Sequence, residues 1–248
     1  MLATISGLNR DFNKALEFLE KANEIQPDNL AILHNIGTAY KELRKFDEAI
    51  NFYEKVLNID SKHTNANYNL GLIFYQMKDL KKAKKYLTKT VDIQSNYALA
   101  FFSLGNVHND LKEYNDAISC YQKAIEINSK IVGAHNNLGL VFRTINDFKN
   151  AIKCYEKAIN LRPDHVGAHH NLALANKELG NFEDAIKSHE QAIKYEPDNL
   201  AHYFYLRDLK KEILDLKLKN KINKIISNEK SSNENKSFGY YLLAQYER

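Results

Sequence analysis

The chain repeats itself at a fixed period of 34 residues, and this self-similarity constrains its fold more than any other feature. Leu104-Gly105 is matched by Leu70-Gly71 one period upstream and by Leu138-Gly139 one period downstream. A fixed period of this length is typical of arrays in which one supersecondary unit is stacked many times. The sequence therefore predicts one elongated array, in place of the one or two ordinary domains that 248 residues would otherwise suggest.

Each period contains two amphipathic segments of helical spacing. In Ala98–Ile131 the first segment places Phe101, Leu104 and His108 on one face, and the second does the same with Ala117 and Tyr121. Two helices of this kind cannot bury their apolar faces alone, so neighbouring pairs must stack. The predicted fold class is therefore all-α, an α-solenoid of stacked antiparallel helix pairs.

A glycine recurs in the middle of the first helix of the repeat, at Gly37, Gly71, Gly105 and Gly139. A glycine inside a helix costs ~1 kcal/mol relative to alanine, so its repetition at one phase needs a compensating reason. We expect the two helices to approach so closely at this point that a Cβ atom would collide. Ala117, early in the second helix, is the other small residue that such a crossing requires.

These residues together resemble the tetratricopeptide repeat (TPR). The segment 132–165 matches the family pattern with His135, Leu138-Gly139, Phe142, Ala151, Tyr155, Ala158 and Pro163. The segment 166–199 departs from it, with Ala173 in place of the glycine and Asn176 and His189 in place of two aromatic residues. The resemblance implies a right-handed superhelix whose first helices line a concave groove.

The repeat phase also divides the chain. Residues 1–29 form a truncated first repeat, 30–199 five full repeats, 200–227 a decayed repeat that could cap the stack, and 228–248 a loop and the start of a further helix. The polar segment Ser227–Ser237 is the best loop candidate. Both ends of the chain interrupt helices, so we expect the natural protein to be longer. The tail more weakly resembles bacterial TPR proteins that continue into a sulfotransferase-like domain.

Composition limits the cellular locations and the binding partners to be expected for this chain. No run of apolar residues is long enough to span a membrane, and the first residues lack the pattern of a signal peptide. Cys120 and Cys154 occupy the same repeat phase, too far apart for a disulfide, which favours reduced thiols and a cytoplasmic protein. We expect a monomer without a membrane partner, although the truncated terminal helices could associate end to end.

One dense basic run begins at Lys78 and continues to Lys89. A nucleic-acid-binding solenoid would carry a basic stripe from repeat to repeat, but acidic residues such as Glu48 and Asp116 interrupt it. The run is therefore interpreted as a solvated outer face, and nucleic acid is not expected as a partner.

The predicted binding residues lie on the first helices, where recurring asparagines resemble the asparagine ladder of TPR-containing glycosyltransferases. An amide both donates and accepts hydrogen bonds, so a ladder could hold the backbone of an extended peptide without dictating its sequence. The asparagines could equally be part of the repeat consensus and bind nothing. The predicted groove residues are Asn35, Asn69, Asn106, Asn137, Asn171, His34, Tyr68, Phe102, Asn136, His170, Tyr75, Arg143 and Lys177.

Other kinds of site are not indicated. A carboxylate clamp for chaperone tails would need lysine at the fifth position of a repeat, where this chain has none. The adjacent His169 and His170 point apart on a helix, and a metal site needs three or four convergent ligands, so no metal site, cofactor or catalytic residue is predicted. The sequence thus predicts a non-enzymatic scaffold that binds a protein or peptide in its groove. The alternative is a substrate-recruiting module of a larger sulfotransferase- or glycosyltransferase-like enzyme.

Overall fold

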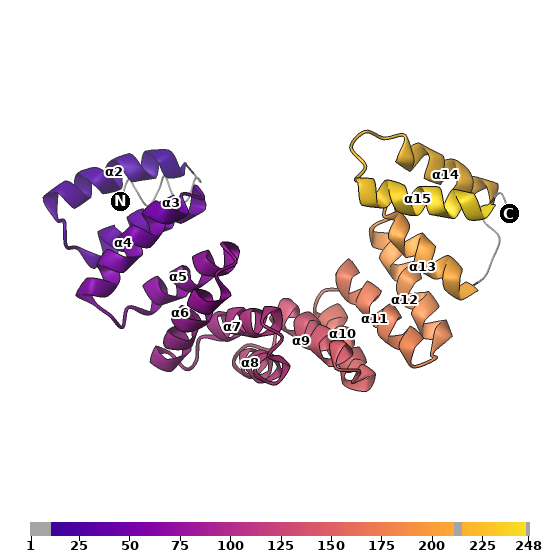
Figure 1. The fold of residues 1–248 in the computed structure, drawn as a ribbon, viewed down its shortest axis with the longest axis horizontal. Helices are drawn as coiled ribbons and strands as arrows, with labels where there is room; N and C mark the ends of the chain where they lie inside the picture. Colours follow the sequence, from indigo (N-terminus) through magenta and orange to yellow (C-terminus); the bar gives the residue numbers. More distant parts are fainter. Residues whose placement is uncertain (1–10, 211–214, 247–248) are drawn as a thin grey trace. The chain divides into compact units, whose positions relative to one another are not determined.

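The computed structural model describes residues 11–210 and 215–246, and every regular element within them is an α-helix. The chain divides into two compact units, unit 1 ending at Ser129 and unit 2 beginning at Lys130. Unit 1 contains α2 (Phe12–Ile25), α3 (Leu30–Glu42), α4 (Phe46–Ile59), α5 (Thr64–Gln76), α6 (Leu80–Ile93), α7 (Ala98–Asp110) and α8 (Tyr114–Ile127) (Figure 1). Unit 2 contains α9 (Val132–Thr144), α10 (Phe148–Leu161), α11 (Val166–Glu178), α12 (Phe182–Tyr195), α13 (Leu200–Lys210), α14 (Leu216–Ile226) and α15 (Asn233–Tyr246).

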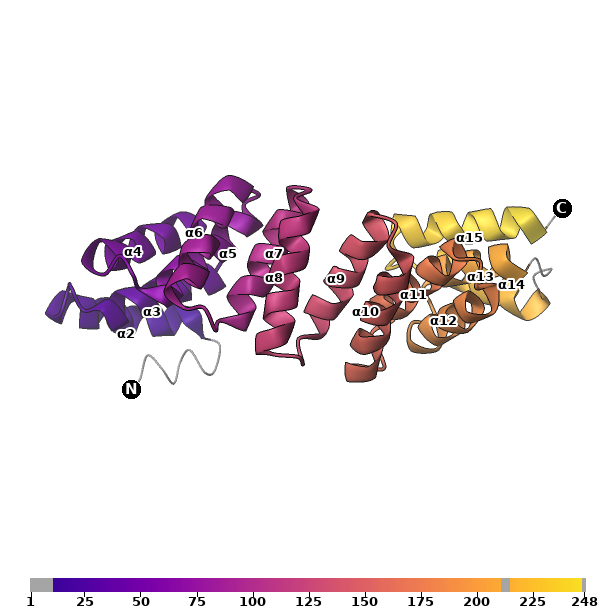
Figure 2. The same ribbon diagram turned by 90° about the horizontal axis from the view of Figure 1, so that it is seen from below.

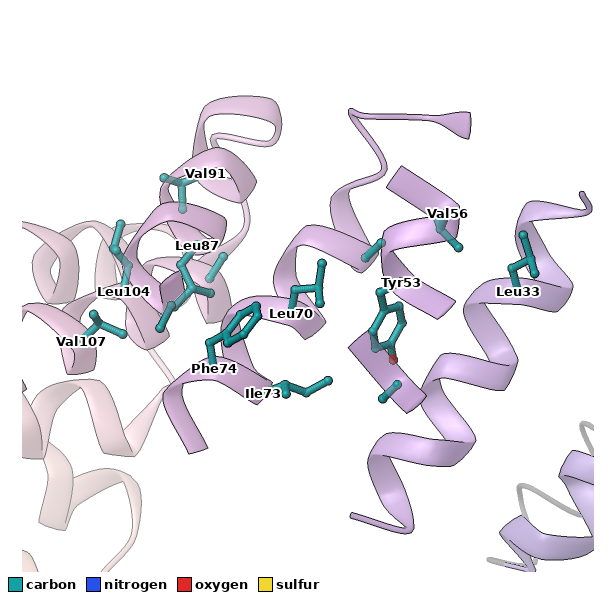
Figure 3. Close-up of a cluster of buried hydrophobic side chains, with 14 residues drawn as sticks. Leu33, Tyr53, Val56, Leu70, Ile73, Phe74, Leu87, Val91, Leu104 and Val107 are labelled. Atoms are coloured by element: carbon teal, nitrogen blue, oxygen red, sulfur yellow. The ribbon is translucent and has the colours of Figure 1, made fainter. Parts of the chain in front are cut away.

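In unit 1 consecutive helices pair as hairpins, α3 with α4, α5 with α6 and α7 with α8. The hairpins stack through contacts of α4 with α5 and of α6 with α7, and α2 packs against α3 (Figures 1 and 2). One apolar core runs through the stack, with Leu33, Tyr53, Leu70, Leu87 and Leu104 all buried (Figure 3). Because each hairpin shares this core with the next, the predicted all-α stack of helix pairs is confirmed within the unit.

The repeated glycines lie at the crossing of the two helices in each hairpin. A Cβ atom on Gly105 would lie 2.7 Å from Cδ1 and Cε1 of the Tyr121 ring, and one on Gly139 would lie 2.7 Å from Cε1 of Tyr155. The expected collision is therefore confirmed, and its partner is the large side chain of the second helix in the same hairpin. Ala117 is fully buried, as a close crossing requires.

The first helices end in turns that share one geometry. Arg44, Lys78, Lys112, Asn146 and Gly180 recur at the repeat period, and all have positive φ, from 59° to 79°. At each turn the next residue donates its amide to a carbonyl near the end of the helix, as Glu113 does to His108 at 2.9 Å. This is the Schellman arrangement, which satisfies carbonyl groups that a helix end would otherwise leave unpaired.

In unit 2, α9 pairs with α10 and α11 with α12, and α12 packs against α13. The last helix, α15, contacts both α13 and α14, and Leu200, Ile222 and Leu242 form a separate buried cluster there (Figure 1). A Cβ atom on Gly239 would lie 2.8 Å from Leu200 Cδ1, so this glycine permits the close approach of α15.

The predicted loop Ser227–Ser237 is shorter in the structure, because α15 begins at Asn233. The Ser232 hydroxyl accepts a hydrogen bond from the Asn235 amide, and the Asn235 side chain bonds the backbone of Leu200 and Asp198. Tertiary contacts of Asn235 therefore extend the helix into a segment whose composition alone favours a loop.

Within residues 11–210 and 215–246, the structure contains no helix with the length and apolar character needed to cross a membrane. Residues 1–10 of the predicted truncated repeat lie outside the described residues.

Candidate peptide-binding face

The predicted binding residues lie on the first helices of the hairpins, α3, α5 and α7 in unit 1 and α9 and α11 in unit 2. Within each unit these neighbouring first helices contact one another. In each unit by itself, we call the side that carries these residues and their neighbours the first-helix face. In unit 1 this face carries His34, Asn35, Lys41, Tyr68, Asn69, Tyr75, Phe102, Asn106 and Asn109, and in unit 2 it carries Asn136, Asn137, Arg143, His170, Asn171 and Lys177.

A polar corner links α3 to α5 on this face. Asn69 Oδ1 accepts a hydrogen bond from Lys41 Nζ at 3.1 Å, and Asn69 Nδ2 lies 3.4 Å from His34 Nε2. Burial, aided by nearby His63, lowers the pKa of His34, so its ring is neutral near pH 7 and can accept from the amide. Asn69 is only 9% exposed, so its amide is already used to join two repeats.

The aromatic side chains of the face are half-buried and held from behind by other rings. Tyr68 lies 4.9 Å from Tyr97 and Phe102 lies 6.0 Å from Tyr121, measured between ring centroids. Burial, with a hydrogen bond to Asp110, raises the pKa of Tyr75 to about 12, so this hydroxyl stays neutral. The face therefore presents partly exposed rings whose positions are fixed.

The asparagines of unit 1 are not equivalent. Asn106 Oδ1 accepts a hydrogen bond from the Tyr121 hydroxyl at 2.8 Å, which ties α7 to α8. Asn35 is exposed, and its side chain forms a hydrogen bond with the neighbouring His34 ring. Asn109 is half-buried, and its side chain has no hydrogen-bond partner within the described part of the chain. A bound peptide could therefore use the Asn109 amide without displacing an internal bond, and the exposed Asn35 amide keeps hydrogen-bonding capacity beyond its bond to His34.

In unit 2 the asparagines bond to each other. Asn171 Nδ2 donates to Asn136 Oδ1 at 3.3 Å, and Asn136 Nδ2 donates to Asn137 Oδ1 at 3.1 Å, which links α11 to α9. Lys177 forms an ion pair with Asp208 of α13, with Nζ and Oδ2 separated by 2.6 Å. The asparagines thus lie outside the apolar core, but several of them connect neighbouring repeats.

His170 belongs to a group that the sequence did not reveal. Its ring lies 5.6 Å, between centroids, from both His189 of α12 and His202 of α13. The pKa of His170 is lowered to about 4 and that of His189 to about 3. Burial is the main cause, and the neighbouring histidines add to it. The three residues come from three helices, so no short sequence motif could have grouped them.

Lysines of the basic run from Lys78 to Lys89 contact side chains within unit 1. Lys84 Nζ lies 2.7 Å from Glu113 Oε2, and Lys82 and Lys85 lie over the rings of Phe74 and Tyr86. These contacts fit the interpretation of a solvated outer face.

Comparison with known proteins gives two kinds of match. Models of the tetratricopeptide repeat match residues 8–58, 97–164 and 130–195, and a model of anaphase-promoting complex, cyclosome, subunit 3 matches residues 42–124. A search of curated proteins finds no match.

Among solved structures, a crystal structure of MamA is 30% identical, with a TM-score of 0.63, and the alignment covers 65% of this chain and 95% of that one. YrrB, described as a TPR protein with an unusual peptide-binding site, is 23% identical with a TM-score of 0.66, and the alignment covers 78% of this chain and 98% of YrrB. At that identity the likeness to YrrB concerns the fold. The repeat models, together with the identity and coverage of the MamA match, show that this chain belongs to the tetratricopeptide repeat family.

Proposed function

We propose that this TPR chain is a non-catalytic interaction scaffold that binds an extended peptide, or an extended segment of a partner protein, on its first-helix face. The observation that carries the proposal is the mixture of fixed, half-exposed rings and accessible amides on the first helices of unit 1, at Tyr68, Phe102, Asn35 and Asn109. The shared fold with YrrB, itself described as having a peptide-binding site, supports it.

The chemistry of the face suits a peptide backbone. Asn35 and Asn109 can each donate to a peptide carbonyl and accept from a peptide N–H, and each such bond contributes about 0.5–1.5 kcal/mol net. The Tyr68 and Phe102 rings offer apolar contact to alternate side chains, with little loss of side-chain entropy because neighbouring rings already hold them.

The test compares two double variants. Asn35→Ala with Asn109→Ala removes the two accessible amides of the face, whereas Asn51→Ala with Asn58→Ala removes exposed amides from the second helix α4. Peptides selected from a random library on the full chain serve as the probe, and their affinity is measured by calorimetry. The face variant should bind about tenfold or more weakly, since two lost bonds correspond to roughly 1–3 kcal/mol.

The control variant should bind as the unaltered chain does, and both variants should melt at nearly unchanged temperature because no amide of either pair joins one repeat to the next. If the face variant keeps its affinity, the peptide lies elsewhere and the assignment is wrong.

We also propose a monomer that acts in the cytoplasm, supported by two cysteines that are free thiols in the structure. The role as a substrate-recruiting module of a larger transferase stays a prediction from the sequence.

A further inference from the structure

Three histidine side chains converge inside unit 2 from three different helices. His170 of α11, His189 of α12 and His202 of α13 each bring one ring nitrogen to within 4.8 Å of the other two. We propose that these histidines form a binding site for one divalent transition-metal ion of the zinc class.

The nitrogen atoms of this cluster lack the partners that buried polar atoms normally have. The exposed fraction is 1% for His189 and 4% for His202. Nδ1 of all three rings, and Nε2 of His202 as well, is buried without a hydrogen-bond acceptor or donor among the residues described. Most buried polar groups in folded proteins are bonded, so several orphaned nitrogens facing one another need an explanation. A metal ion at their centre would take one nitrogen from each of the three rings.

A carboxylate lies beside one of the three rings. His202 Nε2 lies 3.8 Å from Glu196 Oε2, which leaves the Nδ1 side of the ring for the ion. Metal-binding histidines usually direct their second nitrogen to a carboxylate or carbonyl, which fixes the tautomer and the orientation of the ring. Glu196 is placed to take this role for His202.

Aromatic contacts restrain the other two rings. Tyr205 stacks on His189, with ring centroids 5.6 Å apart and planes 7° apart, and lies 5.2 Å from the His170 ring. Its ring therefore covers one side of the cluster and limits the rotation of both imidazoles.

The positive charges near the cluster affect which fourth ligand the metal ion would bind. Lys177 is neutralised by Asp208 at 2.6 Å, but Arg143 Nε is buried without a hydrogen-bond partner in the described structure, and its charge acts on His170. A guanidinium charge near a dication favours an anionic fourth ligand on the metal, such as hydroxide or chloride, which would offset part of both charges.

The donor set selects the class of metal. Three imidazoles are typical ligands of Zn²⁺, Co²⁺, Ni²⁺ and Cu²⁺, whereas Ca²⁺ and Mg²⁺ require oxygen ligands. Zn–N bonds of roughly 2.0–2.1 Å place tetrahedral nitrogens roughly 3.4 Å apart. The rings would therefore close inward slightly on binding. The ion would join α11, α12 and α13 at the point where the regular repeats end.

A second acidic and histidine cluster provides the internal control. In unit 1, His108, Glu113 and Asp116 also approach one another, but His108 Nδ1 already bonds Glu113 Oε2 at 2.6 Å and Lys84 Nζ bonds the same carboxylate. This cluster is satisfied by its own charges, so it offers nothing comparable to a metal.

The test uses the full chain without an affinity tag, stripped of metal by a chelator near neutral pH. Addition of Zn²⁺ should raise the midpoint of thermal unfolding, with one ion bound per chain by calorimetry. Co²⁺ in its place should give the intense visible absorption of a four-coordinate site. Absence of both the thermal shift and the Co²⁺ band in the unaltered chain would overturn the proposal, whatever the variants do.

The variants assign the site. His170→Asn and His202→Asn should each weaken Zn²⁺ binding by about a hundredfold or more, and Glu196→Gln by about tenfold, the range expected for a carboxylate behind a ligand. His108→Asn should leave the affinity unchanged. Circular dichroism of the metal-free variants shows that they are folded; unchanged Zn²⁺ affinity in the folded His170→Asn and His202→Asn chains would place the ion elsewhere and refute the assignment.

Discussion

At the scale of single residues, the hairpin geometry is decided by one glycine and the side chain it faces. Tyr121 is fully buried, and its ring occupies the space where Gly105 would carry a Cβ atom. The same relation joins Gly37 to Tyr53 and Gly139 to Tyr155. In the hairpin of α11 and α12, Ala173 replaces the glycine and His189 replaces the tyrosine.

We predict that Gly105→Leu lowers the free energy of unfolding by about 1–3 kcal/mol or more, because the added atoms overpack the crossing of α7 and α8. Urea denaturation followed by circular dichroism measures the loss. Gly167→Ala is the matched control, since a Cβ atom there meets nothing closer than 3.4 Å. A Gly105→Leu chain as stable as the unaltered one would mean that the crossing has room to spare.

A double-mutant cycle tests the pairing itself. Gly105→Ala combined with Tyr121→His reproduces the pair found in the α11 and α12 hairpin, so it should be less destabilising than the sum of the two single changes.

At the scale of elements, each turn after a first helix contains one residue in the backbone conformation that suits glycine best, and in four of these five turns that residue is not glycine. Lys112 is exposed and has φ of 61°, whereas Gly180 at the same phase has φ of 79° and no atoms near its missing Cβ. A residue with a side chain is destabilised by about 1–2 kcal/mol in this backbone region. Part of this difference is offset, because glycine loses more conformational entropy on folding.

We therefore predict that Lys112→Gly raises the free energy of unfolding by about 0.5–1 kcal/mol and that Gly180→Lys lowers it by a similar amount. Thermal and urea unfolding of the two single variants measure the expected gain and the expected loss of stability in the same protein. Equal stability of all three chains would show that the turn tolerates either residue.

The sequence located these helices well, but not every residue that caps them can be recognised from its type. The period and the apolar spacing placed each hairpin, because burial of one face repeats every turn. The N-caps of α3 and α11 are Asn29 and His165, and His165 Nδ1 accepts from the Ala168 amide at 3.0 Å. Histidine is not among the preferred cap residues, so composition alone does not reveal this role.

The candidate site shows the same limit. The spacing of the first helices predicted that His34 and Asn69 lie near each other, and the structure places their side chains 3.4 Å apart. The spacing could not show that Asn69 and Asn171 contact side chains of neighbouring repeats. The cluster of His170, His189 and His202 depends on how three helices meet, which no local pattern encodes.

At the scale of the whole molecule, each unit has an apolar core of its own. The large core of unit 1 extends from Leu33 to Val107, and the cluster around Leu200 and Leu242 closes the end of unit 2. Repeat arrays gain stability from contacts between neighbouring repeats, so a segment with several stacked hairpins can fold by itself.

We predict that residues 1–129 and residues 130–248, produced as separate chains, are each helical and unfold cooperatively. Circular dichroism and thermal unfolding of the two fragments measure this. If the metal site exists as proposed, Zn²⁺ should raise the midpoint of the second fragment and leave the first unchanged. A fragment without helical signal would show that its hairpins depend on the rest of the chain.

The glycine and the ring that fills its place lie in the two halves of one hairpin, and this has a consequence for how such arrays can change over generations. Whole hairpins carry both halves of the fit, so duplicating or exchanging them preserves it. A breakpoint at the turn would instead join the first helix containing Ala173 to a second helix containing Tyr155 or Tyr121, where methyl and ring compete for one space. Recombination that respects the hairpin boundary should therefore leave functional descendants far more often than recombination within it.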